Sequence, residues 1–179
     1  MSIDLADPDA VAPGGALEDG YGIFAFEADF ASDLRCIPMV VRFKLDRAEI
    51  KLSLKQWTKI GQSNRQALAA TPCNTLHEVT VYRRTLVGMV ERNTPEPIVG
   101  LALNAPLSWA DPARMPNEVA AQALIAGVNP PTDAQWSNLN TLQRFALVKL
   151  ARSNHDNHNF APALREFGIG GFERTSALS

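Results

Sequence analysis

The sequence predicts an all-α protein: a single compact helical domain built from two duplicated multi-helix repeats with a pseudo-twofold relation. Three observations support this fold class: a motif that occurs twice, apolar residues at helical spacing, and hardly any strand alternation. The motif reads Ser53-Leu-Lys-Gln-Trp in its first copy and Thr132-Asp-Ala-Gln-Trp in its second, with an Arg eight residues after each Trp. Every matched position is shifted by 79 residues. We therefore expect two equivalent halves that pack face to face.

Length and composition suggest how the chain is divided. Its 179 residues, 46% of them hydrophobic, suffice for one core and are typical of one domain. Residues 1–22 hold five acidic residues, no Lys or Arg, and few apolar residues, so we expect a flexible acidic N-terminal tail. The helical domain should span residues 23–170, with a C-terminal tail at 171–179. Within the domain we expect repeat one at about 38–91, a connector at about 92–115 and repeat two at about 116–168.

The first helix should run from Pro38 to about Glu49, because proline is well tolerated in a first helical turn. Each copy of the motif then begins with a capping box, in which a hydroxyl and a glutamine side chain bond the first helical amides. From each box, polar and apolar residues at spacings of three and four predict one helical stripe. The boxes are Ser53 with Gln56 and Thr132 with Gln135; the stripes are Trp57, Ile60, Asn64 and Leu68, and Trp136, Leu139, Gln143 and Leu147.

Further helices flank the two copies of the motif. Pro72 should end the helix of the first copy, and Thr75 should open another helix whose apolar residues follow the helical period up to Val90. The proline-rich stretch from 93 to 116 predicts a connector without helix. A helix from Pro116 to about Ala126 and one from 160 to 167, ending at Gly168, complete the second half.

The charge balance and the absence of targeting signals narrow the function class. The formal net charge is −2, and without the acidic tail the body carries only about +3, too little to imply a nucleic-acid partner. A helix-turn-helix regulator is therefore the least favoured class. The sequence shows neither a secretory signal nor an apolar run of membrane-spanning length, so we expect a cytoplasmic protein without a membrane partner.

Neither the cysteines nor any known motif in the sequence indicates a bound cofactor. Cys36 and Cys73 form no C-x-x-C pair, which is typical of reduced thiols and makes a structural zinc site unfavourable. Arg35 could lower the pKa of the Cys36 thiol, although its apolar neighbours favour a buried, inert thiol. The chain has no glycine-rich nucleotide loop, no phosphate-binding loop and no nucleophile elbow. We expect no bound cofactor.

The duplicated motif supplies the first candidate site. Trp57 and Trp136 could frame a ligand, but paired aromatics at matching positions favour structural anchors in the core. Arg65 and Arg144 could converge on an anion or a partner near the pseudo-twofold axis. The alternative, which we favour, is that each guanidinium bonds helix carbonyls of the other half.

A second candidate is the polar run from 153 to 159. His155 and His158 lie three residues apart and could share a helical face that binds a transition metal, with Asp156 or His77 as a third ligand. Asn and Asp are common in turns and caps, so a hydrogen-bonded loop is the favoured explanation. The metal-site hypothesis is the weaker one.

Several stretches of the chain resemble the nitrate reductase associated protein family. The resemblance spans about residues 23–170 and is most specific in its opening block. It rests on Phe24-Ala-Phe-Glu-Ala-Asp-Phe30, Leu34-Arg-Cys-Ile-Pro-Met39, Val41-Arg42, Lys44-Leu-Asp46, Lys51-Leu-Ser-Leu54, Trp57, Pro72-Cys73, Tyr82, Gln143-Arg-Phe-Ala-Leu147, His158-Asn-Phe160 and Glu166-Phe-Gly168.

The resemblance implies a function that composition does not. Members are small bacterial proteins found near genes of assimilatory nitrate reductase and of molybdenum cofactor synthesis. It implies a non-catalytic accessory protein that supports assimilatory nitrate reductase, in maturation, activity or expression, by binding the reductase or its maturation machinery. The alternative is a small metal- or anion-binding enzyme that uses Arg65, Arg144 and the His155–His158 cluster.

This sequence departs from the family pattern in two places. It has the long acidic segment before Tyr21, and it has Glu49 where the family pattern places Gly after Leu45-Asp46. We expect the helix that begins near Pro38 to run slightly longer as a result. The resemblance carries no catalytic residues onto this chain.

Overall fold

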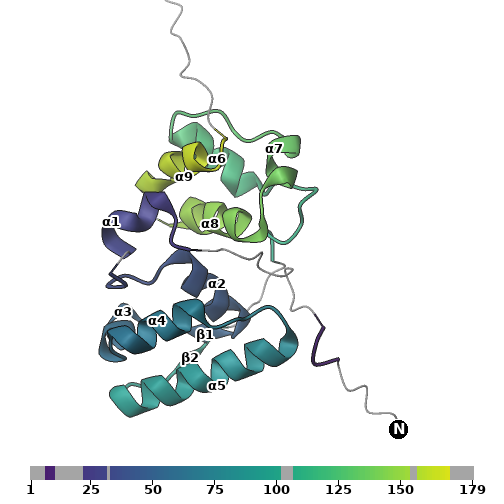
Figure 1. Ribbon diagram of the computed structural model, residues 1–179. Coiled ribbons are helices and arrows are strands. Elements are labelled where there is room, and N and C mark those ends of the chain that lie inside the picture. Colours follow the sequence, from purple (N-terminus) through teal and green to yellow (C-terminus); the bar gives the residue numbers. More distant parts are fainter. Residues whose placement is uncertain (1–6, 11–21, 32, 102–106, 154–156, 170–179) are drawn as a thin grey trace, which may run out of the picture. The chain divides into compact units, whose positions relative to one another are not determined.

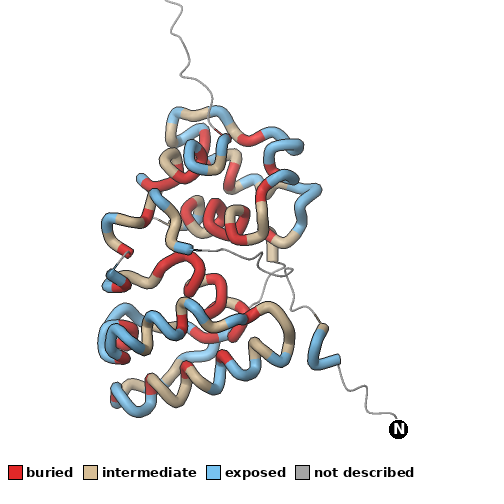
Figure 2. Tube along the Cα trace, viewed as in Figure 1, coloured by how far each residue is buried: buried red, intermediate tan, exposed pale blue. Residues whose placement is uncertain are grey.

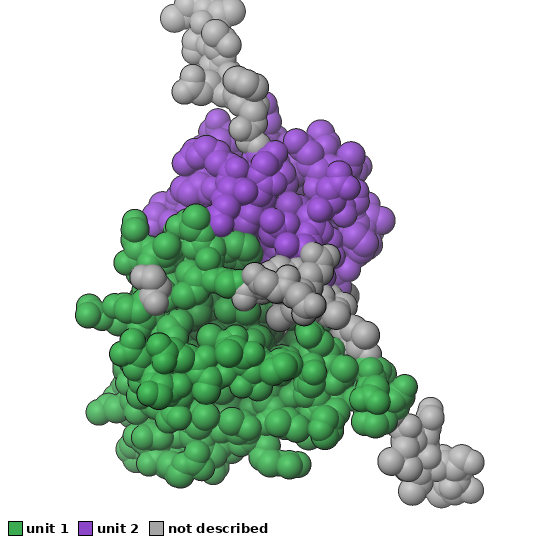
Figure 3. Space-filling model, in the orientation of Figure 1, with its two compact units in different colours: residues 1–106 green, residues 107–179 purple. Residues whose placement is uncertain are grey.

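The computed structural model describes residues 7–10, 22–31, 33–101, 107–153 and 157–169. Most of these residues are helical, which confirms the helical class predicted from the sequence (Figure 1). The chain forms two compact units, unit 1 comprising residues 1–106 and unit 2 comprising residues 107–179 (Figure 3). Duplication of the halves and their pseudo-twofold relation stay predictions. Among the described residues, no helix combines the length and apolar character needed to cross a membrane.

The described residues of unit 1 form six helical segments and a short strand pair. In chain order these are η1 (Ala25–Glu27), α1 (Ala28–Ala31), α2 (Met39–Arg47), β1 (Ile50–Lys51), α3 (Leu54–Lys59), α4 (Gln62–Ala70), α5 (Leu76–Asn93) and β2 (Val99–Gly100). The helix α2 packs against α4 and α5, and α3 packs against α5. Most residues of α2 are buried, among them Phe43 and Leu45, and the helix is largely red in Figure 2. This arrangement places α2 at the centre of the unit 1 core.

In the described part of unit 2 there are four α-helices and one turn of 3-10 helix. They are α6 (Asn117–Ile125), α7 (Asp133–Asn138), α8 (Thr141–Arg152), η2 (Asn157–Asn159) and α9 (Phe160–Glu166). The helix α8 packs against α6, η2 and α9. Its side chains Leu142, Phe145 and Leu147 are fully buried, so α8 forms the core of this unit.

Capping interactions begin several of these helices. Ser53 and Gln56 form a capping box at α3, and Thr132 and Gln135 form one at α7. Thr75 begins α5 in the same way. Helix α2 follows Pro38, whose side chain accepts no capping bond, and Glu27 Oε2 instead accepts a bond of 3.0 Å from Met39 N. A carboxylate at the N-terminal end of a helix also interacts favourably with the helix dipole.

The single helix expected from each copy of the motif is wrong. In the first copy, α3 ends at Lys59 and α4 starts at Gln62, because Gly61 between them has φ 78° and interrupts the helical backbone. In the second copy, Asn140 caps a new helix and accepts a bond of 2.8 Å from Gln143 N. Each motif therefore folds into two consecutive short helices.

Two further expectations about helix ends and strands are corrected. Helix α2 ends at Arg47 and does not run longer, because Glu49 adopts the left-handed conformation with φ 53° that terminates helices. The connector contains β2, which pairs antiparallel with β1 so that Ile50 faces Gly100 and Lys51 faces Val99. This two-stranded sheet joins the end of α2 to the segment after α5.

Part of the segment expected to be a flexible tail contacts α5. The carbonyl of Ala10 accepts a bond of 2.9 Å from Leu76 N, and the carbonyl of Pro8 accepts one of 2.9 Å from His77 N. These amides lie in the first turn of α5, where no intrahelical acceptor is available to them. Residues 7–10 thus help to cap the N-terminus of α5.

Candidate functional site

The Trp and Arg of the first motif bond the same backbone carbonyl. Trp57 Nε1 donates to Leu34 O at 2.7 Å, and Arg65 Nη1 donates to Leu34 O at 2.6 Å. Trp57 is fully buried, whereas Arg65 is half-buried. Leu34 has φ 58°, an uncommon conformation for a non-glycine residue. The two donors therefore hold a strained turn against α3 and α4.

The second motif makes an equivalent arrangement with a different segment. Trp136 Nε1 donates to Asp111 O at 3.0 Å, and Arg144 Nε donates to Trp109 O at 3.0 Å. Arg144 also donates from Nη1 to Leu139 O at the end of α7, and its side chain is buried. The ring of Trp109 meets that of Phe145 edge-on at 5.6 Å. Both copies thus use a Trp and an Arg to fix a distant loop.

These bonds show which backbone carbonyls the two arginines contact within their units. Each guanidinium bonds backbone carbonyls, as favoured from the sequence, but the carbonyls belong to loops of its own unit and not to the other half. Trp57 and Trp136 are core residues in their units. Contact of Arg65 or Arg144 with an anion or a partner stays a hypothesis.

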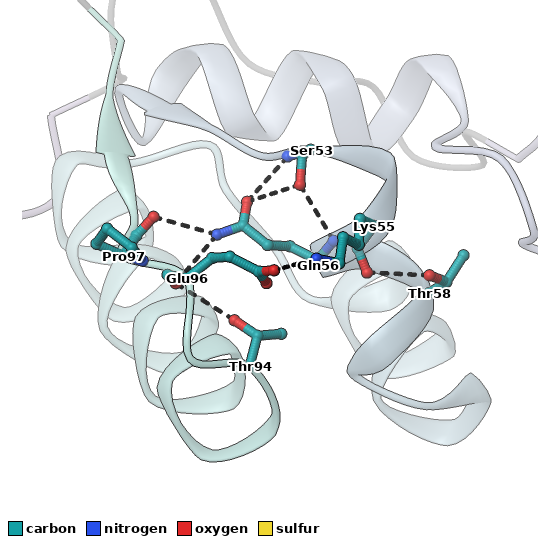
Figure 4. A network of polar contacts seen from close by, with 7 residues as sticks. All are labelled: Ser53, Lys55, Gln56, Thr58, Thr94, Glu96 and Pro97. Carbon is teal, nitrogen blue, oxygen red and sulfur yellow. Dashed lines mark hydrogen bonds and ion pairs between the residues drawn. The ribbon is translucent and has the colours of Figure 1, made fainter.

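Gln56, a capping residue of the first motif, also bonds residues that lie outside its own helix. Gln56 Nε2 donates to Glu96 O at 3.3 Å and to Pro97 O at 3.2 Å, while its Oε1 accepts a bond of 3.0 Å from Ser53 N (Figure 4). Lys55 forms an ion pair with the Glu96 carboxylate beside it. Gln56 is buried, whereas Gln135 is exposed. The first capping box thereby ties α3 to the segment that follows α5.

The structure also reveals a buried polar group that sequence reasoning missed. We call it the Lys44 cluster and define it as Lys44, Arg47, Cys73, Glu78 and Tyr82. Lys44 Nζ donates to the carbonyls of residues 69 and 71 at 2.6 and 2.7 Å, at the C-terminal end of α4. Arg47 Nη1 donates to Cys73 O at 2.6 Å. Two cations from α2 therefore bind the connection between α4 and α5.

Burial shifts the acid–base properties of this cluster. Desolvation lowers the pKa of Lys44 to about 8 and that of Arg47 to about 10, against the opposing effect of Cys73 and Glu78. Burial raises the pKa of the Cys73 thiol to about 11, so Cys73 is a neutral thiol near pH 7. It also raises the pKa of the Tyr82 hydroxyl above its usual range. The Cys73 thiol and the Tyr82 hydroxyl are therefore protonated at neutral pH, whereas the lowered pKa of Lys44 lies closest to neutrality.

Comparison with known families gives the chain an assignment. The family model described as conserved nitrate reductase-associated protein matches residues 23–167. The chain belongs to this family. No curated protein and no solved structure gives a significant match. The resemblance seen in the sequence between residues 23 and 170 is thereby confirmed.

The polar run that contains the candidate metal ligands lies inside the family match. His155 and Asp156 lie outside the described residues, and His158 is exposed in η2. His77 is exposed in the first turn of α5, in unit 1. Within the described ranges, no three His, Cys, Asp or Glu side chains are grouped to hold a metal ion. The metal-site hypothesis for this nitrate reductase-associated protein stays a hypothesis.

One sequence signal could have pointed to the Lys44 cluster. Lys44 and Arg47 lie three residues apart on a helix whose other buried residues are apolar, such as Val41 and Phe43. Residues at this spacing share a helical face, so a charged pair there must lie among core side chains. Arg47 also stacks over the Phe43 ring at 4.4 Å.

Proposed function

We propose that this member of the nitrate reductase-associated family is a non-catalytic accessory protein that supports assimilatory nitrate reductase by protein–protein interaction in the cytoplasm. The family match over residues 23–167 is the observation that carries the proposal. The partner in this proposal is the reductase itself or the proteins that mature it. The accessory protein brings no cofactor or catalytic group of its own.

The chemistry of the described residues is consistent with this role. Arg65 and Arg144, the most conspicuous candidates for an anion-binding enzyme site, donate to loop carbonyls. The buried thiol and phenol of the Lys44 cluster have pKa values above neutrality, which suits neither a nucleophile nor a general base. In this proposal these groups have a structural role, and residues on the surface bind the partner.

Exposed apolar residues indicate where a partner contact could be tested. Leu124 and Ile125 are adjacent at the end of α6 and are 57% and 76% exposed. In unit 1, Leu54 and Val99 are 52% and 55% exposed and provide separate control positions. Adjacent exposed apolar side chains are more informative for a contact than isolated ones.

The deciding experiment measures nitrate reductase in a strain that lacks this gene. Cells are grown on nitrate, and reductase activity is assayed together with reductase protein by immunoblot. Normal protein with lost activity would place the function in maturation or electron supply, and loss of the protein would place it in expression or stability. An unchanged strain would contradict the proposal.

A crosslinking pull-down tests the interaction directly. The tagged protein is isolated from nitrate-grown cells after gentle crosslinking, alongside a Leu124→Ser/Ile125→Ser variant and a Leu54→Ser/Val99→Ser control. We expect nitrate reductase or a cofactor-insertion protein in the bound fraction of the unsubstituted chain. If none of these proteins is captured, an interaction-based role is contradicted.

A further inference from the structure

Unit 1 contains buried hydrogen-bond donors that no described residue satisfies. Arg47 Nε and Nη2 and the Tyr82 hydroxyl are buried and have no hydrogen-bond partner in the described part of the chain. The Arg47 residue is 9% exposed and Tyr82 is 0% exposed. Buried polar groups are nearly always hydrogen-bonded, and an exception is typical of a site for a water molecule or an ion.

The geometry of Arg47 favours an oxyanion. Its Nη1 is held by Cys73 O at 2.6 Å, which leaves the edge formed by Nε and Nη2. The two N–H groups on such an edge are parallel and match two oxygens of one oxyanion. Bidentate binding of this kind is a property of Arg that Lys does not share.

The Tyr82 hydroxyl belongs to the same region of the core. Tyr82 lies on α5, which packs against α2, the helix that carries Lys44 and Arg47. The carbonyl of Cys73 accepts a bond of 2.6 Å from Arg47 Nη1. A hydroxyl donor and a guanidinium edge thus lie on two helices that pack against each other.

The charges of the cluster favour a monovalent anion. Lys44 and Arg47 are both cations, and Glu78 is the one carboxylate that acts on them among the described residues. Glu78 Oε2 already accepts bonds from Asn74 N at 2.6 Å and Thr75 N at 3.1 Å. The Cys73 thiol is neutral and supplies no negative charge. One additional negative charge would balance the buried cations, whereas a dianion would exceed them.

We propose that unit 1 binds one small monovalent oxyanion, of the nitrate, nitrite or formate class, on the Nε–Nη2 edge of Arg47 with the Tyr82 hydroxyl as a further donor. Lys44 contributes positive charge while its own donors remain on the end of α4. The proposal concerns the isolated protein and does not rest on its link to the reductase.

Ligand-dependent stability of the purified full chain tests the site. Thermal unfolding is followed while sodium nitrate replaces sodium chloride at constant total salt, and the series is repeated with nitrite, formate and sulfate. A ligand that binds the native state raises the Tm in a saturable manner. We expect this rise with the three monovalent oxyanions and not with sulfate.

Matched variants assign the response to Arg47. The Arg47→Met variant keeps an unbranched side chain over Phe43 and removes the guanidinium with both of its charge-assisted bonds, so we expect at least a tenfold loss of nitrate affinity, about the factor that a single such bond contributes. Arg84→Met makes the same change at an exposed position of α5 and should keep the response. Arg65→Met should also keep it, although Arg65 Nε lacks a partner among the described residues.

Two measurements decide the proposal even if Arg47→Met does not fold. Tyr82→Phe removes only the hydroxyl and should weaken the nitrate response severalfold. In the ¹⁵N-labelled unsubstituted chain, one buried arginine Nε–H resonance should shift and saturate with nitrate. Equal Tm in nitrate and chloride, an undiminished response in Tyr82→Phe, or no shifted arginine resonance would overturn the proposal.

Discussion

Glu49 adopts a backbone conformation that suits glycine better than glutamate. Its φ is 53°, and the residue follows the C-cap of α2. A side chain at this conformation costs about 1 kcal/mol, which glycine avoids apart from its larger loss of chain entropy. We expect Glu49→Gly to raise the free energy of unfolding by about 0.5 to 1 kcal/mol, measured by urea denaturation.

Glu49→Ala is the matched control for this prediction. It removes the same charge but keeps a Cβ atom, so we expect no comparable gain in the free energy of unfolding. The carbonyl of Glu49 accepts a bond of 2.8 Å from Leu101 N, a backbone interaction that neither substitution removes. Equal stabilisation by Ala and Gly would attribute the effect to the charge and contradict the backbone explanation.

Lys44 should make the stability of the protein depend on pH. Burial lowers its folded-state pKa from 10.5 to about 8, so the unfolded chain binds more protons between these values and stability rises with pH. Cys73 opposes this above its ordinary pKa of 9.0, because its folded-state pKa is raised. From pH 8 to 9 we therefore expect the free energy of unfolding to gain roughly 1 kcal/mol from Lys44.

The Lys44→Met variant isolates this contribution. It removes the titrating amine, so its free energy of unfolding, measured by urea denaturation, should lack the rise between pH 8 and 9. Both chains keep Cys73 and all other titrating groups, so the comparison concerns the slope and not the absolute stability. Parallel slopes in the two chains would show that Lys44 does not titrate in this range.

At the scale of elements, the two capping boxes share their sequence but not their surroundings. Gln56 bonds two carbonyls beyond α5 as well as its own helix, whereas Gln135 is exposed and serves α7 alone. We expect Gln56→Ala to cost about 2 kcal/mol, because it removes two bonds to part-buried carbonyls together with the capping bond, and Gln135→Ala about 0.5 to 1 kcal/mol. Urea denaturation of the two variants compares them, and equal costs would contradict this difference.

Short-range sequence patterns predicted the helices and their caps better than the connections between them. The capping boxes and the helices at 39–47, 76–93 and 117–125 follow from residues that lie close together in the sequence. The break at Gly61 was also signalled locally, since glycine interrupts helices, but the apolar stripe through it favoured one long helix. The pairing of β1 with β2 was not predictable, because each strand has only two residues and no alternation can be recognised.

Long-range contacts explain why the candidate site was incomplete. Lys44 binds carbonyls 25 and 27 residues away, and Arg47 binds one 26 residues away. Backbone acceptors leave no signature in the side chains of a sequence, so the partners of a buried cation cannot be recognised from its neighbours even where helical spacing places the cation in the core. The same holds for the bonds from Arg65 to Leu34 O and from Arg144 to Trp109 O, which span 31 and 35 residues.

At the scale of the whole molecule, the length of the chain predicts one cooperative domain, although the chain forms two compact units. Leu147 is fully buried in α8 of unit 2, and Leu147→Ala should cost about 3 kcal/mol through the cavity it leaves. If the units unfold together, native-state hydrogen exchange should become faster in α5 of unit 1 as well as in α8. Unchanged exchange in α5 would contradict a single cooperative domain.

The placement of the three tryptophans gives each unit its own optical signal. Trp57 lies in unit 1, and Trp109 and Trp136 lie in unit 2; all three are buried. The indole N–H of Trp57 is bonded to Leu34 O, so its emission wavelength depends on whether the turn at Leu34 remains in place. A chain that retains Trp57 as its single tryptophan would emit from unit 1 alone. Partner docking or anion binding in solution could then be followed by fluorescence without an attached dye.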